Sequence, residues 1–205
     1  MSRPLIVALH GVGSSARDMA AALAPLEKLA EVVALDGTDP FDVGATGRQW
    51  FSVAGVTEAN RPDRVASALP ALLDPLDRLA ADHGVRRRDL VLLGFSQGAI
   101  MTLAMVAQGL HAGRAVAIAG RLAAMVSPIE NDAADLLLVH DLADRVMPAS
   151  LSSDAAAKLT AAGHRVEVVH TAGVGHGVGP ATITAITGWL AAADRSPALS
   201  TSLEG

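Results

Sequence analysis

The chain of 205 residues contains no cysteine. This absence excludes a disulfide framework, a thiolate metal site and a cysteine nucleophile. Positive charge is not concentrated either, because the net charge is -5 at pH 7 and the acidic residues are scattered along the chain. Since no basic stripe is present to contact phosphate groups, we expect neither a nucleic-acid partner nor attachment to anionic lipid.

Long hydrophobic runs are also absent. No stretch reaches the roughly 18 uninterrupted apolar residues of a transmembrane candidate, so we expect no stable membrane insertion. The first apolar run, at residues 5–9, is short and leads into His10-Gly11, which is unlike the core and cleavage site of a signal peptide. We therefore predict a cytoplasmic protein.

What the chain does contain is enough apolar material for a core. Hydrophobic residues make up 51% of the sequence and charged residues only 18%, which is far from the composition of a disordered chain. Domains usually run to about 100 to 200 residues. We predict a single domain over residues 1–195 and a flexible tail over 196–205, where hydrophobic periodicity is lacking.

Short β-branched runs alternate with longer segments rich in alanine and leucine. This alternation is typical of an α/β fold in which a mostly parallel sheet carries helices on both faces. Most of the predicted strands are apolar throughout, as expected when both faces are covered. They lie at residues 5–9, 31–35, 90–93, 115–119, 136–140 and 165–170.

The longer segments predict helices at 16–30, 97–108, 154–162 and 181–193. Residues 97–108 are apolar or small almost all round, which indicates a buried central helix. Another helical pattern, at 62–82, contains Pro70 and Pro75. Because proline removes an amide donor and clashes with the preceding turn, we expect a kink or two helices there, with Asp74 capping the second.

The pentapeptide Gly94-Phe95-Ser96-Gln97-Gly98 stands between a predicted strand and the apolar helix. This strand-turn-helix context is that of a nucleophile elbow, in which the serine is exposed on a sharp turn. Side chains two residues before and after the serine would collide, and the two glycines remove them. We predict Ser96 as a nucleophile; for the pentapeptide alone, a fortuitous glycine-rich turn is the alternative.

A glycine-rich turn also follows the first predicted strand, as His10-Gly11-Val12-Gly13. In acyl transfer the carbonyl oxygen becomes negative, and preorganised amides stabilise it. We predict that the backbone N–H groups of Val12 and Gln97 form this oxyanion hole. A phosphate loop is the alternative, but the spacings of dinucleotide and nucleotide loops are absent. His10 itself is expected to be structural.

A serine nucleophile needs a histidine base and a carboxylate that orients it. In this fold the chain order is serine, acid, histidine. Asp144 lies in the loop after the strand at 136–140, and we predict it as the acid, with Asp141 as a turn or capping residue. His176 follows the last strand in a glycine-rich loop, and we predict it as the base.

The same region offers one alternative of another class, a metal site built from His10, His140, Asp144 and His176. These residues lack the close spacings of known ligand motifs. We therefore predict no metal and no cofactor.

Together these motifs resemble the phospholipase/carboxylesterase family, the lidless α/β-hydrolases that include small bacterial carboxylesterases and acyl-protein thioesterases. The resemblance extends over about residues 5–190 and implies that Ser96, Asp144 and His176 form a triad, with Val12 and Gln97 as the oxyanion hole. Two departures, at residues 14–15 and 119–120, leave the chemistry intact and the specificity open. The matching blocks are LHGVG at 9–13, GRQWF at 47–51, GFSQG at 94–98, D-x-V-x-P at 144–148 and GHG at 175–177.

Substrate features are harder to assign from sequence. Residues 120–135, between two predicted strands, are too few for a helical cap, so we expect no cap domain and an open site. No arginine or lysine cluster lies near the motifs in sequence, which gives no reason to expect a strongly anionic substrate. Candidate pocket residues are Trp50, Phe51, Phe95 and Met147, although core packing explains Trp50 and Phe51 equally well.

The predicted activity is hydrolysis of small to medium acyl esters, or thioesters, through an acyl-enzyme. The substrate is expected to be a small molecule, and the oligomeric state, monomer or dimer, stays open. Alternatives within the same chemistry are a lysophospholipase and an acyl-protein thioesterase. An alternative of a different class is a non-catalytic binding protein on the same fold, because fold alone does not fix function.

Overall fold

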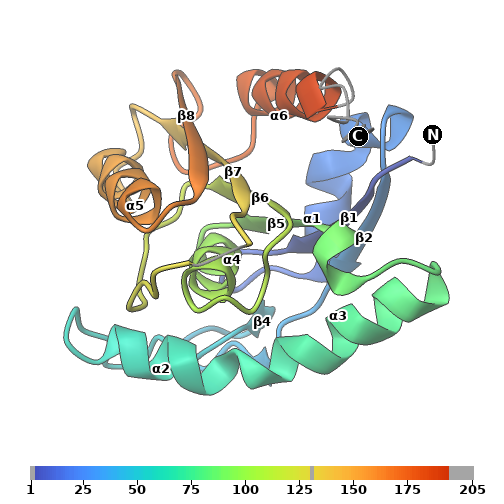
Figure 1. Cartoon of the computed structure of the whole chain (residues 1–205). Helices are drawn as coiled ribbons and strands as arrows, with labels where there is room; N and C mark the ends of the chain where they lie inside the picture. The colour runs from blue at the N-terminus through green and yellow to red at the C-terminus, as the bar shows by residue number, and fades with distance from the viewer. Residues whose placement is uncertain (1–2, 130–131, 194–205) are drawn as a thin grey trace, which may run out of the picture.

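The computed structural model describes residues 3–129 and 132–193 (Figure 1). At its centre is a six-stranded sheet in the order β2-β1-β5-β6-β7-β8, and each pair of neighbouring strands is parallel. The predicted tail at 196–205 lies outside the described residues. The strands are β1 (Leu5–Leu9), β2 (Glu31–Leu35), β5 (Val91–Phe95), β6 (Arg114–Ile118), β7 (Asp135–Asp141) and β8 (Arg165–Thr171).

Strand β1 shows why this sheet needs helices on both faces. Leu5, Val7 and Leu9 belong to one cluster of buried side chains, whereas Ile6 and Ala8 belong to another. Alternate side chains of a strand point to opposite faces. A strand that is apolar throughout therefore needs helices on both faces of the sheet. The predicted mostly parallel sheet with helices on both faces is confirmed.

Two helices cover one face and four cover the other (Figure 1). On the first face lie α1 (Ala16–Leu23) and α6 (Pro180–Ala193). The central helix of the second face is α4 (Gln97–Ala107), all of whose residues are buried, as the apolar pattern predicts. Around it on the same face lie α2 (Arg61–Ala68), α3 (Pro70–Asp82) and α5 (Ser150–Ala161).

Proline placement accounts for two departures from the predicted helices. The segment 16–30 is not one helix, because α1 ends at Leu23 and a 3₁₀ helix, η1 (Ala24–Lys28), begins with a proline in its first turn. The prediction of a kink or two helices at 62–82 is confirmed, since this segment forms α2 and α3. Pro70 occupies the first position of α3, where a missing amide costs nothing. The prediction that Asp74 caps this helix is therefore wrong: Asp74 lies inside α3 and forms an ion pair with Arg78 at 2.5 Å.

The topology brings the loops of interest to one edge of the sheet. After β1 the chain proceeds to β2 on one side, whereas after β5 it proceeds to β6 on the other side, so a switch point lies between β1 and β5. Ligands of open α/β sheets bind at such a point. Between β6 and β7 the described residues form no helix, and no cap domain is present there. In the described part of the chain, no helix has the length and apolar character needed to cross a membrane.

Candidate active site

Ser96 lies on a strained turn between β5 and α4. Its backbone has φ 53° and ψ -113°, in the region that residues other than glycine rarely adopt. A Cβ atom on Gly94 would overlap the carbonyl of Gly98, and one on Gly98 would overlap the carbonyl of Leu9. Both glycines are thus required sterically.

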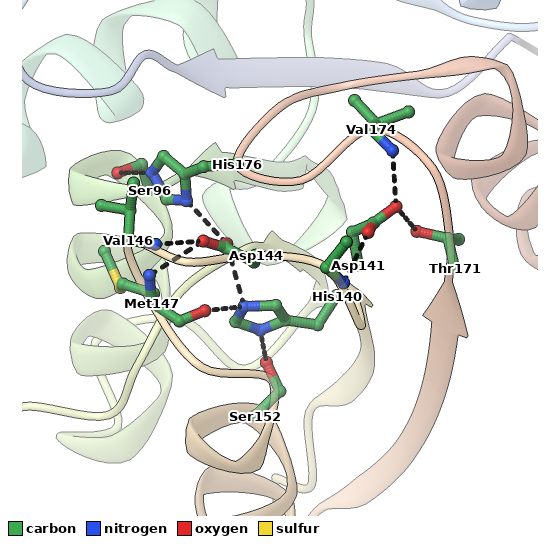
Figure 2. Close-up of polar contacts among 11 residues, drawn as sticks. Ser96, His140, Asp141, Asp144, Val146, Met147, Ser152, Thr171, Val174 and His176 are labelled. Atoms are coloured by element: carbon green, nitrogen blue, oxygen red, sulfur yellow. Dashed lines mark hydrogen bonds and ion pairs between the residues drawn. The ribbon is translucent and has the colours of Figure 1, made fainter.

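Three side chains predicted from the sequence come together at this turn (Figure 2). Ser96 Oγ lies 2.8 Å from His176 Nε2, and His176 Nδ1 lies 2.7 Å from Asp144 Oδ2. The three residues follow β5, β8 and β7, whose carboxyl ends meet at the same edge. The arrangement can pass a proton from the serine to the imidazole while the carboxylate orients the ring.

The carboxylate of Asp144 is held by its own loop as well as by the histidine. Its Oδ1 accepts hydrogen bonds from the amides of Val146 and Met147, at 2.8 and 2.9 Å. Burial raises the pKa of Asp144, but the hydrogen bonds from His176 and from these two amides outweigh it and bring the pKa below the ordinary 3.8. Asp144 is therefore suited to balance a positive charge on His176.

A second imidazole contacts Asp144, and sequence reasoning considered it only as a metal ligand. His140 Nε2 lies 3.2 Å from Asp144 Oδ2 and 2.8 Å from the Met147 carbonyl, whereas its Nδ1 lies 2.6 Å from Ser152 Oγ (Figure 2). With a proton on Nε2, the ring donates toward both oxygens and accepts from the serine hydroxyl. The sequence offered one signal for this contact, namely the position of His140 at the end of a buried strand and four residues before Asp144.

His10 lies apart from this cluster. Its Nε2 accepts a hydrogen bond from the Gly37 amide at 2.9 Å, and its Nδ1 lies 2.7 Å from the Gly11 carbonyl. The four residues of the alternative metal site are thus not gathered around one point. Among residues 3–129 and 132–193, no cluster of histidine and carboxylate side chains has the arrangement of a metal site.

Asp141 has a different set of partners. Its Oδ1 accepts from the Ala143 amide at 2.9 Å. Its Oδ2 accepts from the Val174 amide at 3.1 Å and the Thr171 hydroxyl at 3.3 Å (Figure 2). Asp141 therefore ties the loop after β7 to the loop after β8. Its contacts are those of a turn residue.

The loop that carries Val12 is braced by a short hairpin that the sequence did not predict, formed by β3 (Asp39–Pro40) and β4 (Arg48–Gln49). The amide of Gly13 donates to the Arg48 carbonyl, and the Arg48 amide donates to the Ser14 carbonyl, both at 2.8 Å. Gln97 is the first residue of α4, where helix amides point outward and favour negative charge. Val12 and Gln97 both line the cavity that contains Ser96.

The side chain of Gln97 joins two of the motif blocks. Its Oε1 accepts from the Trp50 amide at 2.8 Å, and its Nε2 donates to the Phe51 carbonyl at 2.7 Å. The indole of Trp50 in turn donates to the His10 carbonyl at 2.8 Å. Through these buried contacts, Trp50 holds the backbone of the loop that precedes Val12.

The cavity at Ser96 has a volume of about 220 Å³. Of the four candidate pocket residues, Phe51 and Met147 line it, whereas Trp50 and Phe95 do not. The Phe95 ring instead lies 5.1 Å from the His176 ring, between centroids. Two charged residues that sequence reasoning missed, Arg61 and Arg121, also line the cavity, whose other apolar walls are Val53, Val56, Ile100 and Val146.

Comparisons with known proteins agree with one another. The sequence profile of the phospholipase/carboxylesterase family matches residues 1–193. Esterase YpfH of Escherichia coli (strain K12) is 34% identical over 181 residues, covering 86% of this chain and 77% of YpfH. The crystal structure of esterase PE8 superposes with a TM-score of 0.80 at 27% identity, over 93% of each chain. A Bacillus cereus carboxylesterase shares the fold, with a TM-score of 0.78 at 18% identity over 93% of this chain and 89% of its own.

Proposed function

The chain belongs to the phospholipase/carboxylesterase family and is a carboxylic ester hydrolase, and from this premise we propose that it cleaves small to medium acyl esters or thioesters through an acyl-enzyme on Ser96. The observation that carries the proposal is the continuous contact from Ser96 Oγ through the His176 ring to Asp144 Oδ2, at 2.8 and 2.7 Å. A serine hydroxyl becomes a useful nucleophile only with such a base beside it.

In the first half of the reaction, Ser96 Oγ attacks the acyl carbon and its proton passes to His176 Nε2. The bond between the acyl carbon and the leaving oxygen or sulfur breaks, and the alcohol or thiol departs with that proton. Asp144 balances the positive imidazole in between. The amides of Val12 and Gln97 donate to the carbonyl oxygen while it is negative.

In the second half, water attacks the acyl carbon and gives a proton to His176 Nε2. The bond from the acyl carbon to Ser96 Oγ breaks, the serine takes the proton back, and the carboxylic acid leaves.

The cavity of about 220 Å³ is smaller than the roughly 300–1,000 Å³ of typical ligand sites, which favours a short acyl group over a long lipid chain. We further propose a cytoplasmic location, since the first apolar run forms the buried strand β1.

Labelling with a fluorophosphonate tests this proposal directly. The reagent is expected to modify the wild type stoichiometrically on Ser96 and to leave Ser96→Ala unmodified, as read by intact-mass spectrometry. The same substitution should lower kcat for p-nitrophenyl butyrate by several orders of magnitude. Ser153→Ala, at an exposed position on α5, is the matched control and should label like the wild type. A folded wild type that takes up no label would instead support a non-catalytic binding protein.

A further inference from the structure

Two arginines lie in the wall of the cavity that contains Ser96. Arg61 is the first residue of α2, and Arg121 follows β6, so they approach the cavity from separate elements. Their side chains are only 15% and 21% exposed. Guanidinium groups that are largely removed from water need anionic partners, and these two line the same cavity as the proposed nucleophile.

One carboxylate already contacts both arginines. Glu58 Oε1 lies 2.6 Å from Arg61 Nη1 and 3.0 Å from Arg121 Nη1, and Glu58 Oε2 contacts Arg121 Nη2. Arg121 thus holds the carboxylate with two parallel contacts, the geometry in which guanidinium groups bind carboxylates best. The two arginines are therefore positioned as a clamp for this chemical group.

Glu58 does not neutralise the two arginines from within the cavity. It is absent from the residues that line the cavity, and its side chain is 69% exposed. Arg121 Nε is buried and has no hydrogen-bond partner among the residues that the structure describes. Two guanidinium groups against one carboxylate leave one positive charge in a largely apolar wall, where water screens it weakly.

We propose that the site prefers esters whose acyl group ends in a carboxylate, such as half-esters of short dicarboxylic acids. Arg61 and Arg121 bind the free carboxylate, the apolar walls receive the methylene groups, and the ester carbonyl lies at Ser96. This inference rests on the proposed esterase function and names its substrate class. The sequence alone indicated no basic cluster near the motifs. Arg61 and Arg121 are distant from the motifs along the chain, but the fold brings both to the cavity wall.

Glu58 has a second role in this proposal, as the group with which the substrate competes. Because Glu58 is exposed, its side chain can turn toward water when a substrate carboxylate occupies the arginines. Removal of its charge should therefore favour acidic substrates. A purely structural ion pair predicts the opposite, since loss of Glu58 would then disorder both arginines and weaken the pocket.

The test compares two esters of similar length, p-nitrophenyl hydrogen glutarate and p-nitrophenyl valerate, by the ratio of their kcat/KM values. Arg121→Gln and Arg61→Gln should each lower the ratio of acidic to neutral ester by about tenfold to a hundredfold, the usual range for a lost charged hydrogen bond. Glu58→Gln should raise the ratio. Arg78→Gln, which removes an exposed arginine paired with Asp74 on α3, is the matched control and should leave the ratio unchanged.

Free glutarate provides a second measurement that does not need turnover of an acidic ester. It should inhibit valerate hydrolysis competitively in the wild type, more strongly in Glu58→Gln and more weakly in Arg121→Gln. An unchanged ratio in both arginine variants, or a lower ratio in Glu58→Gln, would overturn the carboxylate clamp while leaving the esterase proposal intact. Failure of the esterase proposal has a distinct signature, because the wild type would then neither label nor hydrolyse valerate.

Discussion

Asp141 is the last residue of β7, and Asp144 lies in the turn that follows. Both are buried, yet their surroundings differ. Asp144 faces His176 and His140, and its partners include two imidazole rings. Asp141 faces the backbone of the neighbouring loop and accepts from the Val174 amide. We therefore predict that Asp144 balances charge on an imidazole, whereas the contacts of Asp141 join two loops.

The comparison shows that burial and hydrogen bonding do not by themselves identify a catalytic acid. Burial raises the pKa of each aspartate, and hydrogen bonds to each outweigh burial, so that both pKa values lie below the ordinary 3.8. What separates the two is the identity of the donor. Only a donor that gains charge during the reaction makes use of a carboxylate beside it.

The largest effect should come from exchanging each carboxylate for an amide. Asp144→Asn should lower kcat by about 10⁴-fold, because the amide cannot stabilise the positive His176 and favours the wrong tautomer. Asp141→Asn should stay within about tenfold of the wild type, since this side chain contacts neither Ser96 nor His176. Steady-state kinetics on p-nitrophenyl butyrate decide the point, and the reverse order would reassign the acid to Asp141.

An intermediate effect is expected at His140, which touches Asp144 without touching Ser96. His140→Leu should lower kcat by about tenfold to a hundredfold with little change in KM, because Asp144 loses one of its fixed donors and shifts. The Met147 carbonyl and the Ser152 hydroxyl also lose their partner, which should cost about 1–3 kcal/mol in the free energy of unfolding.

Ser152→Ala serves as the matched variant, because it removes only the hydroxyl that orients the His140 ring. It should lower kcat less than His140→Leu does. Equal kcat values for the wild type and His140→Leu would show that the Asp144 loop alone fixes the acid. Urea unfolding of both variants separates a loss of activity from a loss of stability.

The smallest effect concerns pH and Asp141. Its pKa is lower in the folded chain than the ordinary 3.8, because the hydrogen bonds from Ala143, Val174 and Gly175 outweigh burial. Such a group contributes stability that is complete above about pH 3.8 and is lost as the pH falls through the folded pKa. The difference in unfolding free energy between wild type and Asp141→Asn should thus be constant from about pH 8 to 5 and shrink below about pH 3.8. A difference that changes between pH 8 and 5 would point to another titrating group.

Much of the fold could be predicted from the local pattern of apolar and polar residues along the chain. Strands β1 and β2 have the predicted bounds, and the other four differ by one or two residues at their ends, because pairing with a neighbouring strand extends or shifts them. Strand β5, for example, continues to Phe95, which pairs with Ile118. Buried parallel strands carry a strong apolar signal, whereas their ends depend on the adjacent strand.

A motif or the chain order constrained part of the candidate site. Ser96, Asp144 and His176 lie on loops whose order the fold fixes, and the structure brings their side chains into contact, while their catalytic roles stay predictions. No motif or chain order points to Arg61 and Arg121, since they reach one cavity only after α2 and the loop beyond β6 fold together. The hairpin β3–β4 is likewise too short for a pattern of alternating side chains.

Gln97 makes position 97 unusually hard to change in isolation. Its main-chain amide is the one we propose for the oxyanion hole, while its side chain holds the backbone of residues 50 and 51, one of which forms a cavity wall. A substitution would therefore alter pocket shape together with turnover. For anyone who wishes to redesign selectivity, residues 50, 51 and 97 form one unit, and libraries that vary them jointly have the better prospect of retaining activity.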